Sequence, residues 1–253
     1  MKKVIFLGGK EIGVFCLSHI IELRQELGYE LIGVVPNSNS LLSKDDRTID
    51  LAKKHGIQVL NSIDIQVLKE VDYLVSVQYD KILDEAQISS VKKLALNLHM
   101  APLPEYRGCN QFSFAIIDGV SEFGTSIHRL DPVIDGGDLI CENRFEMDDE
   151  LFVRELYDQT VQQSKTLFAA KWTEIMSDRF ELTPQSELTN RKSGFHLRKE
   201  INDIKRIQKS WPLEKQLRYF RATYFPPFSP PVLVDGEEVL QELDMDWYNS
   251  NRA

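Results

Sequence analysis

The sequence predicts an α/β protein with a mostly parallel central sheet, followed by a small C-terminal α+β extension. One observation is an apolar run at 3–7, followed by two glycines and a helix-like run at 11–27. A second apolar run at 30–35 follows this helix. A strand–helix–strand start of this kind builds a parallel sheet with right-handed crossovers. The third observation is an Asp-Gly pair between the apolar halves of 232–240, which is typical of a β-hairpin with a type I′ turn.

The elements between these ends alternate in the same way. Helices are predicted at 47–54, 110–117, 149–177 and 212–223, and strands at 57–60, 71–77, 93–98, 123–129 and 139–145, with a polar loop at 37–46. The last two strands are expected to be antiparallel partners, since mixed sheets are common. We therefore predict a Rossmann-like domain over residues 1–179 and an extension over residues 180–253.

The composition is that of an ordinary soluble globular protein. Of 253 residues, 42% are hydrophobic and 27% charged, and no apolar run approaches the ~18 residues of a membrane span. Only five apolar residues precede Gly8, which is too few for a signal peptide, so we expect a cytoplasmic location. Three cysteines without paired spacing argue against a disulfide framework, and no cluster of ligand residues predicts a metal site.

Charge is unevenly distributed along the chain. The net charge of −9 disfavours broad, non-specific binding of nucleic acid. Within 191–221, however, 10 basic residues stand against 3 acidic ones. This local excess suits a compact polyanion such as a diphosphate, and it is equally typical of a solvated helix face.

The stretch at 94–140 contains the residues best suited to chemistry. Asn97 and His99 end an apolar run, and residues two apart on a strand share one face. A proline- and glycine-punctuated loop follows, and Asp135 lies in a glycine-rich turn further on. A histidine can accept a proton from an attacking amine, a nearby carboxylate favours its charged form, and an asparagine amide can stabilise an oxyanion. The alternative is a capped strand end with an interior hydrogen bond.

Three separated motifs agree in order and spacing with a known family. They are Asn97-x-His99, Pro102-Leu-Pro104-x-Tyr-Arg107-Gly108 and Asp135-x-Gly-Asp138. Together they resemble the core of the N10-formyltetrahydrofolate-dependent formyltransferases, including the family's usual interval from His99 to Asp135. The resemblance implies an enzyme that takes N10-formyltetrahydrofolate as formyl donor and uses Asn97, His99 and Asp135 as its catalytic triad.

The segment after the predicted strand at 71–77 is expected to lie beyond its carboxyl end, where open α/β sheets bind ligands. In the family, the equivalent loop holds the pterin of the folate largely through backbone groups. On this basis the residues assigned to the folate are Gln78, Tyr79, Ile82, Leu83 and Asp138. Lys81 is expected either to face a substrate phosphate or to be an ordinary surface lysine.

The extension resembles the nucleotide-sugar N-formyltransferases, which carry a similar Arg-Ala-x-x-Phe-Pro-Pro run, here at 221–227. Aromatic residues fixed by prolines can stack on a nucleobase, or simply form a rigid run that packs on the domain. The expected substrate contacts are Lys81, Asn110, Arg221, Tyr224 and Phe225. The resemblance implies formyl transfer to the amino group of a dTDP-linked 4-amino-4,6-dideoxy sugar for O-antigen biosynthesis, by a homodimer.

Three alternatives stay open. Glycinamide ribonucleotide formyltransferases share the triad, but they usually end near the long helix. Methionyl-tRNA formyltransferase is favoured by the basic excess at 191–221, but its C-terminal β-barrel needs more chain than the extension provides. The alternative of another class is a protein that binds folate or nucleotide without catalysis.

Overall fold

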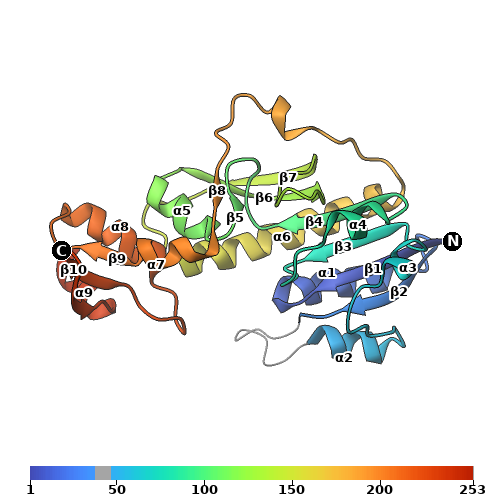
Figure 1. Cartoon of the computed structure of the whole chain (residues 1–253), viewed down its shortest axis with the longest axis horizontal. Helices are drawn as coiled ribbons and strands as arrows, with labels where there is room; N and C mark the ends of the chain where they lie inside the picture. Colours follow the sequence, from blue (N-terminus) through green and yellow to red (C-terminus); the bar gives the residue numbers. More distant parts are fainter. Residues whose placement is uncertain (38–46, 253) are drawn as a thin grey trace.

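A six-stranded mixed sheet forms the centre of the molecule (Figure 1). The computed structural model describes residues 1–37 and 47–252, so the loop predicted at 37–46 lies almost entirely outside the described residues. In spatial order the strands are β2 (Tyr29–Val35), β1 (Lys2–Gly8), β3 (Tyr73–Val77), β4 (Leu94–His99), β6 (Glu122–Arg129) and β7 (Leu139–Glu146). The first four are parallel, whereas β6 and β7 are antiparallel to their neighbours. The predicted α/β class with an antiparallel pair is confirmed.

Helices cover both faces of this sheet. They are α1 (Lys10–Leu23), α2 (Arg47–Lys54), α3 (Ile65–Leu68), α4 (Glu85–Ser89), α5 (Gln111–Asp118) and α6 (Val153–Met176). Alternate residues of β1 point to opposite faces of the sheet. On one face Phe6 packs with Leu17 of α1 and Trp172 of α6, and on the other Leu7 packs with Leu68 of α3. Because both faces are buried, the parallel strands are continuous apolar runs. Among the described residues, no helix is long and apolar enough to cross a membrane.

The strand predicted at 57–60 is wrong. Only Val59 forms a bridge, to Val34 at the edge of the sheet. Two backbone hydrogen bonds flank it, from the Val34 N–H to the Gln58 carbonyl and from the Leu60 N–H to the Val34 carbonyl. The chain then turns away at 61–64, so the segment is too short to form a ladder with β2.

The C-terminal residues form a second, smaller sheet at the end of the molecule away from the N-terminus (Figure 1). Its elements are α7 (Ile201–Ile204), β9 (Arg206–Gln208), α8 (Leu213–Thr223), β10 (Val232–Asp235), β11 (Glu238–Glu242) and α9 (Met245–Asn251). The hairpin of β10 and β11 was predicted, but its type I′ turn is wrong. Gly236 and Glu237 connect the strands, and only Gly236 has a positive φ, of 60°, whereas a type I′ turn needs two.

A connecting segment links the two sheets, and we call residues 183–198 the strap. Figure 1 shows the chain leaving α6, arching over β6 and β7, and descending beside α5. The Thr183 backbone exchanges two hydrogen bonds with Leu139 at the start of β7. Further on, β8 (Phe195–His196) pairs in parallel with β5 (Arg107–Gly108). The strap therefore contacts the loops that follow β4 and β6.

Candidate active site

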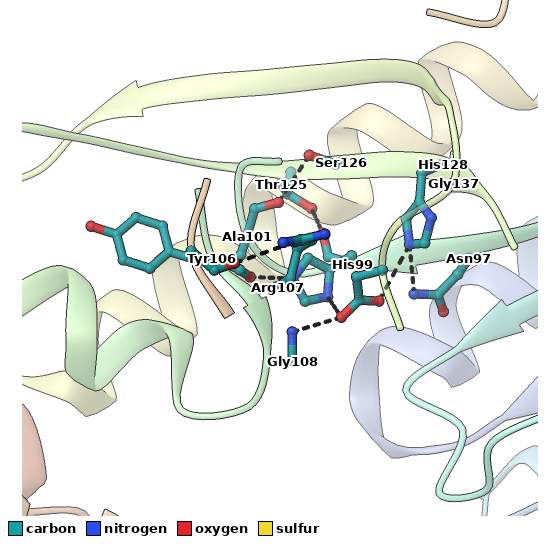
Figure 2. A network of polar contacts seen from close by, with 12 residues as sticks. Asn97, His99, Ala101, Tyr106, Arg107, Gly108, Thr125, Ser126, His128 and Gly137 are labelled. Atoms are coloured by element: carbon teal, nitrogen blue, oxygen red, sulfur yellow. Dashed lines mark hydrogen bonds and ion pairs between the residues drawn. The ribbon is translucent and has the colours of Figure 1, made fainter. Parts of the chain in front are cut away.

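Asn97 and His99 lie at the carboxyl end of β4, in the middle of the sheet. The antiparallel register with β6 places His128 opposite Asn97 and Ser126 opposite His99. Figure 2 shows the side chains of Asn97, His99 and His128 gathered in one place. His99 is 7% exposed and His128 is fully buried. The strand therefore supplies the predicted pair on one face, and its antiparallel neighbour adds a second imidazole.

Asp135 reaches the same place from the loop between β6 and β7. Its carboxylate Oδ2 lies 3.6 Å from Nδ1 of His99, and Oδ1 lies 3.5 Å from Nε2 of His128. The backbone N–H of Gly108 donates to Oδ2 at 2.9 Å. The three residues predicted from the sequence as a triad thus come together around one carboxylate, although their roles stay predictions.

The backbone at Asp135 has an uncommon conformation. Its φ of 51° is in the left-handed region, which costs a non-glycine residue about 1–3 kcal/mol. Gly137 lies two residues after Asp135 in the same loop. A Cβ atom added at Gly137 would lie 2.0 Å from the carbonyl oxygen of Arg129, so only glycine fits there. The loop is thus held in one shape by close approach to β6, and that shape aims the carboxylate at the histidines.

Asp135 is ionised at neutral pH. Burial by itself would raise the pKa of its carboxyl. The charge of His99 acts against burial most strongly, the Gly108 N–H adds to it, and the pKa is held well below its usual range. A buried anion is therefore available to stabilise positive charge on His99.

The hydrogen-bond partners of His99 indicate its protonation state. Nε2 lies 2.7 Å from the carbonyl oxygen of Tyr106, which can only accept, so Nε2 carries a proton. Nδ1 faces the ionised Asp135 carboxylate, which is also an acceptor. An imidazole with an acceptor at each nitrogen is arranged to hold both protons and a positive charge. This arrangement suits stabilisation of developing negative charge better than removal of a proton.

Asn97 is oriented by His128. Nδ1 of His128 lies 2.8 Å from the carbonyl oxygen of Arg129 and therefore carries a proton. Nε2 is then free to accept from the Asn97 amide, 3.2 Å away. The second N–H of that amide has no partner within residues 1–37 and 47–252, so it can donate to a ligand. His128 was not among the predicted site residues, and the signal for it was its place on a strand beside the site.

The loop after β4 is fixed by buried hydroxyl groups. Thr125 donates to the carbonyl oxygen of His99 at 3.1 Å, and Ser126 donates to that of Ala101 at 2.9 Å. The phenol of Tyr106 donates to Asp118 at 3.1 Å. These contacts set the position of the Tyr106 carbonyl. Because this carbonyl accepts from Nε2 of His99, they also determine that Nε2 carries a proton.

The residues predicted to bind the folate have varied surroundings. Gln78, with a φ of 52°, accepts from Lys10 through its side chain and from Asn37 through its backbone. Tyr79 is half-buried, and Ile82 is 76% exposed just beyond β3. Leu83 is 8% exposed and packs in the apolar core with Leu7 and Leu68, and its contact with the folate stays a prediction.

Asp138, also assigned to the folate, forms an ion pair of 2.7 Å with Arg129. The backbone N–H of Arg129 donates to the Asp138 carbonyl at 2.8 Å. These contacts close the base of the Asp135 loop. The structure therefore shows a loop-closing contact for Asp138, and its assignment to the folate remains a prediction.

The predicted substrate residues do not all lie free for a ligand. Lys81 is exposed. Asn110, with a φ of 59°, donates to the carbonyl oxygens of Leu197 and Arg198, which attaches the strap to α5. The buried guanidinium of Arg221 donates to the Asp149 carbonyl at 2.9 Å and pairs with Glu150, which joins α8 to the segment before α6, and its contact with a substrate stays a prediction.

The aromatic–proline run packs on the molecule. Tyr224 stacks on Phe220 with ring centroids 4.9 Å apart, and Phe225 packs against Tyr157 of α6 at 5.8 Å. Both rings are half-buried, whereas Phe228 is 41% exposed. The alternative of a rigid run that packs on the domain therefore describes Tyr224 and Phe225 in this structure, and their contact with a base stays a prediction.

The cluster of Asn97, His99 and Asp135 lies within a segment of the chain that matches a known family. Residues 51–171, which include all three side chains, match the formyl transferase family model, so this part of the chain is a formyl transferase domain. The resemblance stated from the sequence is confirmed. Within the described residues, no group of His, Cys, Asp and Glu is placed to hold a metal ion.

Similar proteins extend the match beyond this domain. The chain is 23% identical to methionyl-tRNA formyltransferase of Clostridium tetani, covering 94% of this chain and 83% of that protein. It is 26% identical to GDP-perosamine N-formyltransferase of Brucella melitensis, covering 71% and 67%. An N-formyltransferase from Helicobacter canadensis, solved with folinic acid and dTDP-3-aminofucose, has the same fold, with a TM-score of 0.75, 23% identity and coverage of 89% and 81%.

Proposed function

We propose that this protein transfers a formyl group from N10-formyltetrahydrofolate to the amino group of a nucleotide-linked sugar. The observation that carries the proposal is the buried cluster of Asn97, His99 and Asp135 inside a formyl transferase domain. The bound ligands of the Helicobacter canadensis enzyme and the substrate named for the Brucella melitensis relative support a nucleotide sugar as acceptor.

The reaction forms one C–N bond and breaks another. The neutral sugar amine attacks the formyl carbon, and the formyl oxygen takes up negative charge. The free N–H of Asn97 donates to this oxygen, and the charged imidazole of His99 stabilises it. Collapse of the intermediate breaks the bond to N10 of the folate, which gains one proton while the amine loses one.

Asp135 keeps His99 charged and correctly turned during these steps. Of the two roles expected for His99, proton acceptance and assistance to the oxyanion, the partners of its ring favour the second. The folate is proposed to lie beyond the carboxyl ends of β3 and β4, against the loop that begins at Gln78. Tyr79 and Ile82 are proposed as its apolar contacts.

The identity of the acceptor is the finer part of the proposal. We retain a dTDP-linked 4-amino-4,6-dideoxy sugar and O-antigen biosynthesis in the cytoplasm by a homodimer, as the sequence suggested. The Helicobacter canadensis enzyme was solved with a 3-amino sugar, so the position of the amine is the variable that needs testing first. Residues 180–253 are proposed as the part of the chain that selects the nucleotide.

The test is an end-point assay with N10-formyltetrahydrofolate and a panel of acceptors. The panel contains dTDP-, GDP- and UDP-linked sugars with 3- or 4-amino groups, glycinamide ribonucleotide and charged initiator tRNA. Mass spectrometry detects the gain of one formyl group, and His55→Ala, at an exposed position after α2, controls for His99→Ala. Formylation of an amino sugar supports the proposal and names the sugar.

The same panel decides between the alternatives. Formylation of the tRNA alone would contradict the sugar proposal and favour the function named for the Clostridium tetani relative, which the chain matches over most of its length. Binding of folate without product on any acceptor would favour the non-catalytic alternative. A wild-type rate in His99→Ala would remove the proposed role of the cluster.

A further inference from the structure

Gln185 of the strap contacts the loop that carries Asp135. Its position is set by the preceding residues, because the backbone of Thr183 is hydrogen-bonded to Leu139 in both directions, at 2.8 and 2.9 Å. Leu139 directly follows the loop that carries Asp135. The strap is therefore anchored next to this loop, and the side chain of Gln185 reaches over it.

The amide of Gln185 binds the loop backbone at two points. Its Nε2 donates to the carbonyl oxygen of Asp135 at 2.8 Å and to that of Gly137 at 2.7 Å. Its Oε1 is buried and has no hydrogen-bond partner in the described part of the chain. The amide cannot be turned over, because Oε1 would then face two carbonyl oxygens that only accept. The two donated hydrogen bonds thus define the orientation of Gln185 at the cost of an unsatisfied oxygen.

The carbonyl groups of Asp135 and Gly137 belong to the part of the loop whose backbone conformation places the Asp135 carboxylate. Asp135 has a φ of 51°, and a more common backbone angle would turn its carboxylate away from His99 and His128. A conformation of this kind persists only where its surroundings hold it. We propose that Gln185 is a positioning residue, which holds the Asp135 loop so that the carboxylate faces both imidazoles.

The rest of the strap holds the second loop of the site. The carbonyl oxygen of Gly194 accepts from the backbone N–H of Arg107 at 3.2 Å, and that of His196 accepts from Cys109 at 2.9 Å. Gly108, whose N–H donates to Asp135, lies between Arg107 and Cys109. One continuous segment, outside the span that matches the family model, therefore fixes both loops that surround the carboxylate. The inference rests on the proposed function, since it gives Gln185 a part in the same reaction.

The test compares Gln185→Met, which keeps the length of the side chain and removes its donors, with Gln162→Met at an exposed position on α6. We expect kcat of Gln185→Met to fall about tenfold to hundredfold, since small displacements of a catalytic group have effects of this size. KM for both substrates should change little. Gln185→Asn, which keeps the amide and shortens its reach, should show a smaller loss in the same direction.

A second readout does not depend on turnover. Against the effect of burial, the charge of His99 and the Gly108 N–H hold the pKa of the Asp135 carboxyl well below its usual range, so the ¹³C NMR titration of this carboxyl reports whether it keeps its partners. With the carboxylate displaced, the titration of Asp135 should move to higher pH in Gln185→Met but not in Gln162→Met. A purely structural role would lower the melting temperature and leave this titration in place, which would overturn the inference.

A double-mutant cycle identifies the route of the effect. In an Asp135→Asn background, Gln185→Met should cost less than about twofold in kcat, because the carboxylate that it positions is already gone. Equal losses in both backgrounds, or unchanged kcat in the single variant, would overturn the inference. If the wild-type protein formylates none of the acceptors, the proposed function fails, and the titration of the Asp135 carboxyl still decides the role of Gln185.

Discussion

Asp135 and Asp178 lie at opposite ends of the sheet, and each has a left-handed backbone and a carboxylate paired with basic side chains. Asp178 follows α6 and lies near the amino ends of the parallel strands, where Lys2 begins β1 and Lys93 precedes β4. Both lysines pair with its carboxylate at 2.8 Å, and the phenol of Tyr73 donates to it. Like Asp135, Asp178 has a left-handed backbone, with a φ of 56°.

The pKa of both carboxyl groups lies well below its usual range, but for different reasons. For Asp178 the hydrogen bonds from Lys2, Lys93 and Tyr73 lower the pKa directly. For Asp135 burial acts in the opposite direction, and the charge of His99 and the Gly108 N–H lower the pKa against it. The side chain of Asp178 is 45% exposed and that of Asp135 is 12% exposed.

The difference between the two clusters lies in their partners. Lysines keep their charge throughout the physiological range, so the Asp178 cluster is constant and joins the start of three strands to the end of α6. Imidazoles gain and lose protons near neutral pH, so only the Asp135 cluster can respond to a reacting substrate. We propose that one arrangement of charge serves folding at one end of the sheet and chemistry at the other.

The largest expected effect is the loss of turnover at the Asp135 end. His99→Ala should lower kcat about 10²–10⁴-fold, and Asn97→Ala about 10²–10³-fold, as expected for the loss of an oxyanion donor. Asp178→Asn should leave kcat unchanged. Steady-state kinetics of the purified, folded variants measure both, and a similar loss in Asp178→Asn would contradict the division between the two ends.

A smaller effect is expected from the backbone that supports Asp135. Gly137→Ala brings a methyl group against the carbonyl oxygen of Arg129 and should lower kcat about tenfold or more by displacing the loop. Gly28→Ala, at a φ of 66° with open space around it, should lower the free energy of unfolding by about 1–2 kcal/mol and leave kcat alone. Equal kcat values for the two variants would show that the loop tolerates displacement.

Acid should act on stability through both carboxylates. A folded pKa below the unfolded value of about 3.9 stabilises the folded state above that pH, and the stabilisation is lost as pH falls through the folded pKa. Asp178→Asn should therefore unfold at lower urea concentration at pH 7 and lose less further stability between pH 5 and pH 3. Parallel stability curves for variant and wild type over this range would argue against the contribution of Asp178.

The smallest effect concerns salt. The exposed Asp178 pairs should be screened in 1 M NaCl, where the Debye length is about 3 Å, so the stability difference between Asp178→Asn and wild type should shrink. The loss of kcat in Asp135→Asn should persist, because the buried pairs are shielded from ions. Melting temperatures and kcat at low and high salt provide the comparison.

Much of the fold and of the central cluster could be predicted from the sequence. Buried parallel strands are unbroken apolar runs, and the motif spacing identified Asn97, His99 and Asp135, which the structure brings together. The strand at 57–60 failed because a short apolar run at a sheet edge can form a single bridge as well as a ladder. The three residues of β9 are too few to show a pattern.

The contacts that sequence reasoning missed depend on register and on distant segments. His128 joins the site because of the antiparallel register of β6 with β4, which residue types do not reveal. Gln185 reaches Asp135 across 50 positions of chain. Arg221 was assigned to the substrate from a motif, whereas its burial against Asp149 is set by how α8 packs on α6. Local pattern predicts the elements, but not which loops a later segment will hold.

One measurement tests the central claim most directly: transfer of a ¹³C-labelled formyl group from N10-formyltetrahydrofolate to the amino sugar that the panel identifies. Wild type, Asp135→Asn and Asp178→Asn would be compared at the same concentration after each is shown to be folded. We predict labelled product from wild type and Asp178→Asn at the same rate, and a loss of about 10²-fold or more in Asp135→Asn. Equal rates for Asp135→Asn and wild type would contradict the account.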